Sequence, residues 1–515
     1  MTLKENLVIS VPRLEIHRPP ISTAIVCSVI KQAGHPVQAL DLNIKYYNFL
    51  GSIDKFLDMD DVWAGERSMS VKEKNDINEF LLSYVEQIAT YDRVFVSVFG
   101  FWCHQFTEML LTVIRTHLPH IEIVLGGQGV LATTVGKSAK HFGEIMKSKK
   151  LCDTWLAGEG EKVIIDILNT DVKDKPGLNN PDYKQLNDLD NLPFPDYGFY
   201  DLDEYDYLSE DKEVFIVGSR GCVRRCTYCD VARYWPKFRF RSGENLASEM
   251  INHYEQHGVK RFYFTDSLIN GSIKAFHDMC EQLADYNANH KVGFKWGGQI
   301  IFRPPKQLPK DHYELVARAG GDLFLVGYET GSDKIRWEMD KKFSNDDTEW
   351  QLEEFSKHGL HAMFLMVTGY LTEQLEDHEE TLKIFDRWQR FVADGTITQI
   401  DLGSTLYFLA DTPLARMIDS HEVYFLNVGA DIEDKQNQNN RLWQTKLNPD
   451  LDVAERIRRQ IEIHKTAIKY NWPVSRGVNR IRTLKLMTKL YYDFLKSNNN
   501  PKMIQDAETG LRWVN

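Results

Sequence analysis

Three cysteines near the middle of the chain carry its clearest chemical signal. Cys222, Cys226 and Cys229 stand in the segment GSRGCVRRCTYCDVARY with the spacing C-x3-C-x2-C. Three thiolates on one loop can bind three irons of a [4Fe–4S] cluster and leave the fourth iron open to a substrate or cofactor. The spacing therefore predicts an iron–sulfur centre with one reactive iron.

Two other uses of these cysteines fit the sequence less well. A structural zinc site requires a fourth Cys or His at ligand spacing, and the nearest histidines, His253 and His257, belong to a later helical segment. A group of reduced core cysteines is disfavoured because the neighbouring Arg224, Arg225 and Asp230 are poor core residues.

The loop and its surroundings resemble the radical S-adenosylmethionine (SAM) superfamily. The aromatic Tyr228 before the third cysteine and the strand-like VFIV before the loop extend the likeness. The resemblance implies that SAM binds the open iron through its amino and carboxylate groups. It also implies that the reduced cluster gives one electron to SAM, which splits into methionine and a 5′-deoxyadenosyl radical that takes hydrogen from an unactivated carbon.

A set of alternating strands and helices must position this loop. Residues 212–430 contain six strand-like segments separated by helical ones, which predicts a partial (β/α)6 barrel with its active-site groups at the carboxyl ends of the strands. The expected strands are 214–219, 261–266, 292–299, 322–332, 360–370 and 397–409.

The resemblance also implies which side chains contact SAM. GYETGS at 327–332 is similar to the family's fourth-strand motif, and FLMVTGYLTE at 364–373 to a fifth-strand motif. For each single residue, ordinary strand packing or helix capping is an alternative, whereas the set along one barrel rim favours a SAM site. The candidates are Tyr228, Asp266, Ser267, Gln299, Glu329, Ser332, Gly369, Leu406 and Tyr407, with Glu373 opening the next helix.

Residues 1–170 form a second α/β region. Strand-like and helical segments alternate there, which predicts a doubly wound, Rossmann-like parallel sheet with its ligand at the carboxyl ends of the strands. A dinucleotide site is disfavoured because GGQG at 126–129 is not G-x-G-x-x-G and does not follow the first strand. The expected strands begin at Leu7, Val37, Arg93, Ile121 and Leu151.

This region resembles the cobalamin-binding domain that precedes many radical SAM barrels. The resemblance rests on RPP with a helix after the first strand, VSVFGFW after the third, GGQG after the fourth and GEGE after the fifth. No D-x-H-x-x-G motif offers a histidine to cobalt, which implies a corrin whose lower face has no such ligand. Packing is the alternative for the aromatic residues. The implied contacts are Ser97, Phe101, Trp102, Gly126, Gly127, Gly158 and Glu159.

Composition limits the cellular setting. Seven cysteines in 515 residues fit a reducing compartment, and the amino-terminal MTLKENLVIS lacks the apolar run of a signal peptide, so we expect a cytoplasmic protein without membrane spans. The net charge of −12 disfavours nucleic acid as a partner, and the basic stretch 456–496 is interpreted as a solvated helix face. The expected partners are a small-molecule or peptide substrate and a one-electron donor such as flavodoxin or ferredoxin.

Three other segments are less informative. We expect a linker over 171–211 and a helical region over 431–515, and we assign no role to the insert 50–79. One face of the carboxyl-terminal helix could cap the barrel mouth or pack beside the barrel. That face comprises Ile481, Leu484, Met487, Tyr491 and Phe494.

The resemblance favours cobalamin-dependent C-methylation, with three alternatives. A radical SAM cyclisation, rearrangement or oxidation would need no cobalamin. A methylthiotransferase would need a second cluster, for which Cys27, Cys103 and Cys152 are the right number but lack the family's flanking sequence. A non-catalytic redox sensor would need no SAM site.

Overall fold

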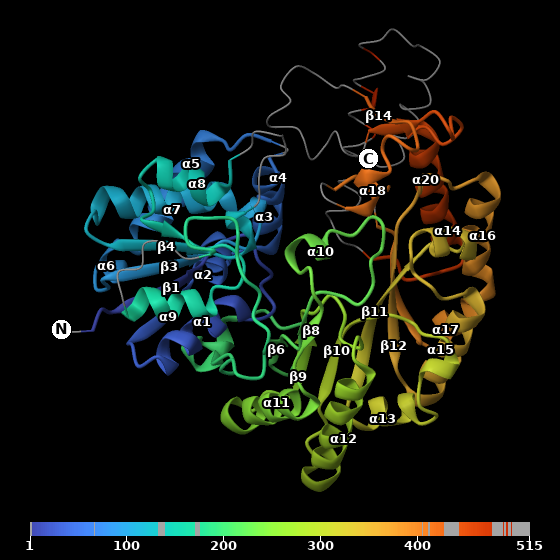
Figure 1. Ribbon diagram of the computed structural model, residues 1–515, viewed down its shortest axis with the longest axis horizontal. Helices are drawn as coiled ribbons and strands as arrows, with labels where there is room; N and C mark the ends of the chain where they lie inside the picture. Colours follow the sequence, from blue (N-terminus) through green and yellow to red (C-terminus); the bar gives the residue numbers. More distant parts are fainter. Residues whose placement is uncertain are drawn as a thin grey trace. The chain divides into compact units, whose positions relative to one another are not determined.

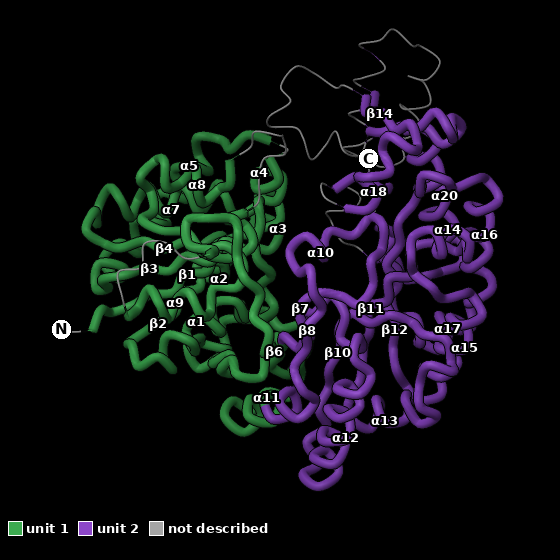
Figure 2. The backbone as a smooth tube through the Cα atoms, viewed as in Figure 1, with its two compact units in different colours: residues 1–216, 249–262 green, residues 217–248, 263–515 purple. Residues whose placement is uncertain are grey.

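The computed structural model divides into two compact units, which Figures 1 and 2 display. Unit 1 comprises residues 1–216 with 249–262, and unit 2 comprises residues 217–248 with 263–515. The structure describes residues 3–65, 67–131, 140–169, 176–403, 405–409, 412–426 and 442–475, together with Thr488, Tyr491, Tyr492 and Lys496.

A parallel five-stranded sheet forms the centre of unit 1. Its order is β2-β1-β3-β4-β5, so the direction of winding reverses between β1 and β3. The parallel sheet confirms the predicted α/β fold. Ligands of such doubly wound sheets bind outside the carboxyl ends of the strands, at the point of reversal. The strands are β1 (Asn6–Ser10), β2 (Val37–Asp41), β3 (Arg93–Ser97), β4 (Glu122–Gly126) and β5 (Thr154–Trp155).

Alternate residues of these strands enter two separate hydrophobic cores. Val8, Phe95 and Val124 belong to a core that contains Cys27. The residues next to them in each strand belong to the other core, which also contains Cys103 and Cys152. The main helices are α1 (Ile21–Gln32), α2 (Leu42–Leu50), α5 (Val71–Leu82), α7 (His104–His117), α8 (Phe142–Ser148) and α9 (Glu161–Asn169).

The described parts of the insert and of the expected linker contain short helices. The insert 50–79 contains α3 (Ile53–Asp58), α4 (Asp60–Trp63) and the start of α5, which a capping box of Ser70 and Glu73 opens. The expected linker belongs to unit 1, where Tyr197 is fully buried and Tyr205 donates a 2.8 Å hydrogen bond to Asp41. Its short helices are η3 (Tyr197–Phe199) and η4 (Leu202–Glu204).

A six-stranded sheet in the order β13-β12-β11-β10-β9-β6 forms the expected partial barrel. Strands β10 to β13 pair in parallel, and helices lie along the outside of them (Figure 1). The strands are β6 (Glu213–Ile216), β9 (Arg261–Phe264), β10 (Lys295–Ile300), β11 (Gly321–Glu329), β12 (His361–Met366) and β13 (Ile397–Asp401). The helices are α11 (Gly243–His257), α12 (Ile273–His290), α13 (His312–Arg318), α14 (Asp333–Glu338), α15 (Asn345–His358), α16 (Leu375–Arg387) and α17 (Gln389–Ala393).

The sixth strand is shorter than the sequence predicts. It ends at Asp401, whose Oδ1 accepts a 2.9 Å hydrogen bond from the Gly403 amide, and Gly403 has a φ of +60°. This local side-chain turn ends the strand. Leu406 and Tyr407 therefore follow the sixth strand and are not part of it, which corrects the expected extent of 397–409.

The carboxyl-terminal part is not purely helical. Strands β14 (Val423–Phe425) and β15 (Trp443–Thr445) pair antiparallel, α18 (Pro413–Arg416) precedes them in sequence, and α20 (Val453–Lys469) follows them. Tyr491 is buried, whereas the other four residues of the proposed cap face lie outside the described residues. Within the described ranges, no helix is both long and apolar enough to cross a membrane.

Candidate functional site

The three predicted cluster cysteines lie on one loop after the first barrel strand. The loop follows the short strand β7 (Ser219–Arg220) and ends at α10 (Val231–Tyr234), while β7 pairs antiparallel with β8 (Arg239–Phe240). Gly221 has a φ of +94°, a conformation that glycine adopts without the steric cost of a Cβ. Cys226 is buried, whereas Cys222 and Cys229 are partly exposed.

The surroundings of these thiols fit iron binding. The Arg224 amide donates to Cys222 Sγ at 3.4 Å. Burial raises the pKa of the Cys226 thiol and raises that of Cys229 to about 11, so a buried thiolate needs a compensating positive charge, which bound iron supplies. Among the described residues, no three His, Cys, Asp or Glu side chains are grouped as ligands of a single metal ion.

Asp266 supports the strand that leads into the cluster loop. It is buried after β9, and its Oδ2 accepts a 2.9 Å hydrogen bond from the Gly218 amide. Burial raises the pKa of Asp266 to about 7. Ser267 and Gln299 are partly exposed nearby, and the Gln299 carbonyl accepts a 2.9 Å hydrogen bond from the Ile269 amide. The structure thus brings the candidates from the second and third strands to one edge.

Glu329 lies at the centre of a buried polar group beside the cysteines. Its backbone has a φ of +68° at a register shift between β11 and β12, and its carboxylate pairs with Lys341 at 2.6 Å. The Lys341 ammonium is also 5.9 Å from the ring centroid of Tyr228. Burial alone would lower the pKa of Lys341, but Glu329 and the thiols of Cys226 and Cys229 raise it above its ordinary value.

Sequence reasoning missed Lys341. It follows α14, twelve residues after Glu329, and no periodicity indicates that it folds back against the strand end. Its side chain is only 9% exposed and that of Glu329 only 7%. Buried lysine is rare unless it is paired, so this contact joins the fourth strand to the segment after α14, and the same ammonium lies over Tyr228 of the cluster loop.

An apolar wall adjoins this polar group. Tyr228 packs against a core that contains Leu406 and Tyr370, and the Tyr370 hydroxyl is 2.9 Å from Thr227 Oγ1. Leu406 thus belongs to the core against which Tyr228 packs, even though it is not on a strand. Tyr407 is partly exposed next to it. Of the expected SAM contacts, Tyr228 and Glu329 both lie against Lys341, and Leu406 belongs to the core beside Tyr228.

Three other family-matched positions have clear structural roles. Ser332 caps α14 and donates a 2.7 Å hydrogen bond to Asp377. Gly369 has a φ of +80°, and its amide donates to Glu373 at 3.1 Å. Glu373 in turn pairs with Arg459 of α20 at 2.9 Å. These contacts hold the barrel rim in shape and engage the Ser332 hydroxyl and the Gly369 amide, two of the positions that the resemblance assigned to SAM.

The carboxyl edge of the unit 1 sheet presents exposed aromatic rings. Phe99 and Phe101 are 49% and 37% exposed, and both rings lie within 6.1 Å of the Trp102 ring by their centroids. Ser97 ends β3 and lies 3.3 Å from Ser22 between their hydroxyl oxygens. Large exposed apolar groups at a ligand-binding edge are typical of a site for an apolar ligand.

The glycines at this edge divide into open and packed positions. A Cβ on Gly126 would meet open space, so a ligand can approach its backbone. Gly127 has a φ of +94°, and a Cβ there would overlap the Val98 carbonyl. Gly158 packs against the ring of Tyr183, and buried Glu159 accepts a hydrogen bond from the Leu186 amide. Gly158 and Glu159 therefore hold unit 1 together.

His104 is the histidine closest in sequence to this aromatic group. Its Nε2 is 2.8 Å from the Gly129 carbonyl oxygen, and its ring stacks on Phe142 with centroids 3.8 Å apart. Burial lowers the pKa of His104 to about 4, so it is neutral near pH 7. Because its ring is engaged inside unit 1, His104 does not serve as an exposed metal ligand.

Comparisons with known proteins agree with this architecture. The chain is 24% identical over 295 residues to the anaerobic magnesium-protoporphyrin IX monomethyl ester cyclase of Synechocystis. The aligned residues make up 54% of this chain and 56% of the relative. The chain thus spans about half the length of the curated relatives it matches.

Two solved structures share the fold. OxsB, a cobalamin-dependent S-adenosylmethionine radical enzyme solved with aqua-cobalamin and S-adenosylmethionine, aligns with a TM-score of 0.62 and 14% identity, over 99% of this chain and 79% of its own. TsrM from Kitasatospora setae, a radical S-adenosylmethionine methyltransferase solved with cobalamin and a [4Fe–4S] cluster, aligns with a TM-score of 0.57 and 15% identity, over 84% and 81%.

The family model of the radical SAM superfamily matches residues 216–385. The match begins at the end of β6, includes the three cysteines and extends through most of α16. A [4Fe–4S] cluster and SAM are the cofactors that such a domain implies. The chain therefore carries a radical SAM domain, built on the cysteine loop and the partial barrel.

Proposed function

We propose that this radical SAM enzyme uses cobalamin to transfer a methyl group to an unactivated carbon of a small molecule or peptide. One observation carries the proposal: a chain with a radical SAM domain also has an open, aromatic carboxyl edge on a doubly wound sheet of order 2-1-3-4-5. OxsB and TsrM, which share this fold, were solved with cobalamin bound.

The cysteine loop and the barrel rim would hold the cluster and SAM. Together these groups supply a 5′-deoxyadenosyl radical when reduced. Cys222, Cys226 and Cys229 would bind iron, and Tyr228 with Leu406 would form the apolar side of the SAM site. The Glu329–Lys341 pair would fix the loop and the fourth strand in one arrangement, which limits misplacement of the reacting carbon.

The carboxyl edge of unit 1 would hold the corrin. Cobalamin supplies a transferable methyl group when bound. Phe99, Phe101 and Trp102 offer apolar area to a large planar ring, and the open face of Gly126 allows close approach to the backbone. His104 is committed elsewhere, in agreement with a corrin face that has no histidine from this edge.

The cyclase relative gives a second candidate. The match to the Synechocystis cyclase favours a radical oxidation or ring closure with the same cluster and SAM chemistry. A methylthiotransferase is disfavoured because its second cluster would need Cys27, Cys103 and Cys152 together. Cys27 belongs to one core of unit 1, and Cys103 and Cys152 belong to the core on the other side of the sheet.

The proposed setting is the cytoplasm, with flavodoxin or ferredoxin as the electron donor. All seven cysteines are free thiols in the structure. A reducing compartment keeps such thiols available for iron.

Anaerobic purification and iron analysis provide the first test. The wild-type chain should bind about four irons and form 5′-deoxyadenosine from SAM on reduction. Cys226→Ala should lose both properties, whereas Cys280→Ala, at a buried thiol of α12, should keep them. About eight irons would favour the second-cluster alternative.

Cobalamin binding separates the two leading reactions. A corrin absorption band that remains with the protein after gel filtration, together with transfer of a labelled SAM methyl group to product, is the expected result. If saturating cobalamin leaves no bound corrin while 5′-deoxyadenosine still forms, the methyltransferase proposal is wrong and the cyclase candidate is favoured.

A further inference from the structure

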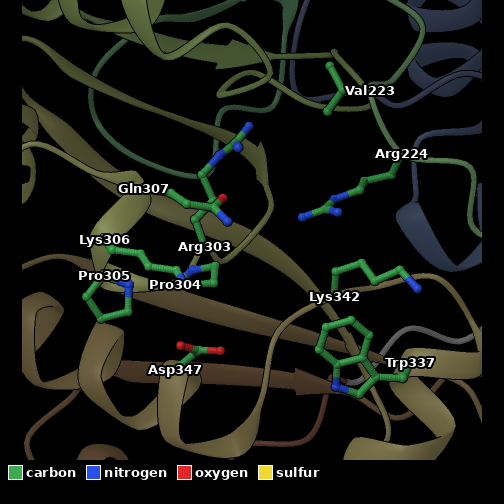
Figure 3. Close-up of a pocket in the computed structure, with 10 residues that line it drawn as sticks. All are labelled: Val223, Arg224, Arg303, Pro304, Pro305, Lys306, Gln307, Trp337, Lys342 and Asp347. Carbon is green, nitrogen blue, oxygen red and sulfur yellow. The ribbon is translucent and has the colours of Figure 1, made fainter.

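A cavity of about 880 Å³ opens beside the cluster loop within unit 2. Its walls come from the cluster loop, from the segment after β10 and from the region of α14 and α15. Figure 3 shows the Arg224 and Arg303 side chains extending into the same open space. The remaining lining side chains used below are Lys306, Lys342, Trp337 and Asp347.

The cavity is positively charged although the chain is acidic. Four cationic side chains line it, namely those of Arg224, Arg303, Lys306 and Lys342, against one carboxylate, Asp347. That carboxylate is engaged, since it accepts hydrogen bonds from Ser344. The formal net charge of the whole chain is −12, so a cavity lined by four cationic side chains has the opposite sign of charge to the chain as a whole. An anionic partner would be repelled by most of the chain and attracted here.

The charges inside the cavity are incompletely compensated. Arg303 Nη2 donates to the backbone carbonyls of Asn270 and Gly271, and the buried Nε atoms of both Arg224 and Arg303 have no hydrogen-bond partner. Lys342 pairs with Asp340 at 3.0 Å, but its side chain remains 39% exposed and its ammonium lies 4.9 Å from the Trp337 ring centroid. A negatively charged group entering the cavity would compensate these charges.

The cavity wall is directly connected to the proposed cluster. Val223 and Arg224 lie between Cys222 and Cys226 in sequence, and Val223 is 43% exposed. Arg224 makes two contacts: its backbone amide donates to Cys222 Sγ, and its side chain lines the cavity. A partner seated here would therefore contact the peptide that holds a cluster ligand.

We propose that this cavity and its rim dock an acidic one-electron-carrier protein that reduces the cluster. The inference rests on the proposed function, because that function requires an external electron. One electron leaves the reduced carrier and enters the oxidised cluster, so the carrier is oxidised by one electron and no atom is transferred. Acidic side chains of the carrier insert among Arg224, Lys306 and Lys342, and Trp337 supplies exposed apolar area at the rim.

The test compares reduction of the cluster by two donors of opposite charge. The full chain with reconstituted cluster is mixed anaerobically with reduced flavodoxin, an acidic protein, or with the methyl viologen radical cation. Bleaching of cluster absorbance gives the rate of reduction independently of SAM turnover. The charge-reversal variant is Lys306→Glu/Lys342→Glu. The matched control is Lys357→Glu/Lys446→Glu, at exposed lysines elsewhere in unit 2.

The pocket variant should be reduced by flavodoxin roughly tenfold more slowly than wild type at low ionic strength, because electrostatic steering of this kind changes association rates by about 10 to 1,000-fold. The difference should shrink as salt screens the charges. Reduction by methyl viologen should be unchanged, and the control variant should behave as wild type with both donors.

Three results would overturn the docking proposal. These are equal rates for the pocket and control variants with flavodoxin, an equal loss with methyl viologen, or, in a parallel titration of wild type and the pocket variant with inorganic pyrophosphate, loss of pyrophosphate binding by the variant without any change in its reduction by flavodoxin. The last result would assign the cavity to a small anion. Failure of the proposed function is recognised separately, because a wild-type chain that is reduced by viologen yet forms no 5′-deoxyadenosine lacks the SAM reaction.

Discussion

Replacing Lys341 by methionine tests its buried ion pair with Glu329, which lies beside Tyr228 of the cluster loop. Methionine has a similar length and no charge, so Lys341→Met keeps most of the apolar contact and leaves the Glu329 carboxylate without its cation. The pair is separated by 2.6 Å, and both side chains are less than 10% exposed. Removal of one partner of such a pair leaves a buried uncompensated charge, which costs about 3–5 kcal/mol.

The expected effect is large enough to measure by calorimetry. For a unit of this size, 1 kcal/mol changes the melting temperature by roughly 2–4 °C, so a loss of about 3 kcal/mol predicts a decrease of roughly 6 °C or more in the metal-free chain. The neighbouring Lys342→Met is the matched control. Its salt bridge to Asp340 is solvent-exposed, and exposed pairs contribute about 0–1 kcal/mol.

A double variant separates the ion pair from other effects of the substitution. Lys341→Met/Glu329→Gln removes both charges, so it should recover most of the lost stability, because a neutral pair carries little desolvation cost. The reasoning is refuted if Lys341→Met melts within about 2 °C of wild type, or if the double variant is no more stable than Lys341→Met alone.

Two further predictions concern Asp266 in unit 2 and the neighbouring glycines Gly126 and Gly127 in unit 1. Burial raises the pKa of Asp266 from an ordinary 3.8 to about 7, so protonated Asp266 stabilises the folded chain below about pH 4, and this stabilisation is lost as the pH rises to 7. Asparagine does not titrate. The melting temperature of Asp266→Asn relative to wild type should therefore be higher at pH 8 than at pH 5, which calorimetry at both values checks. Gly126→Ala should fold normally but retain less corrin, whereas Gly127→Ala should lower the melting temperature because its Cβ would overlap the Val98 carbonyl. Normal corrin retention by Gly126→Ala would contradict the proposed approach to that backbone.

The sheets of both units could be predicted because the sequence pattern of each strand and helix lies within one short segment of the chain. Strands such as Asn6–Ser10 and Arg93–Ser97 are short apolar runs followed by helices, and this alternation specifies parallel sheets without knowledge of distant contacts. The cysteine spacing is equally local. The predicted residues at the ends of β9, β10 and β11 therefore fell near one edge of the barrel.

The contacts that the sequence did not reveal are nonlocal. Lys341 pairs with a strand end twelve residues earlier, and Tyr205 bonds to Asp41 across 164 residues. The sixth strand was predicted too long because STLYFL reads as apolar strand, whereas the turn of Asp401 with Gly403 ends it. In each case a specific tertiary or side-chain contact overrides the propensity of the segment.

Residues whose polar groups already have a hydrogen-bond or ion-pair partner support the fold, whereas residues without such a commitment are available to a ligand. Ser332, Glu373 and Glu159 match family positions, yet each already has a hydrogen-bond or ion-pair partner within the fold. A ligand that took these groups would have to replace an existing buried interaction, which costs free energy. The exposed ring of Phe101 and the open face of Gly126 carry no such cost. We therefore expect ligands to contact residues that a motif identifies only weakly, whereas Ser332, Glu373 and Glu159 mainly support the surrounding structure.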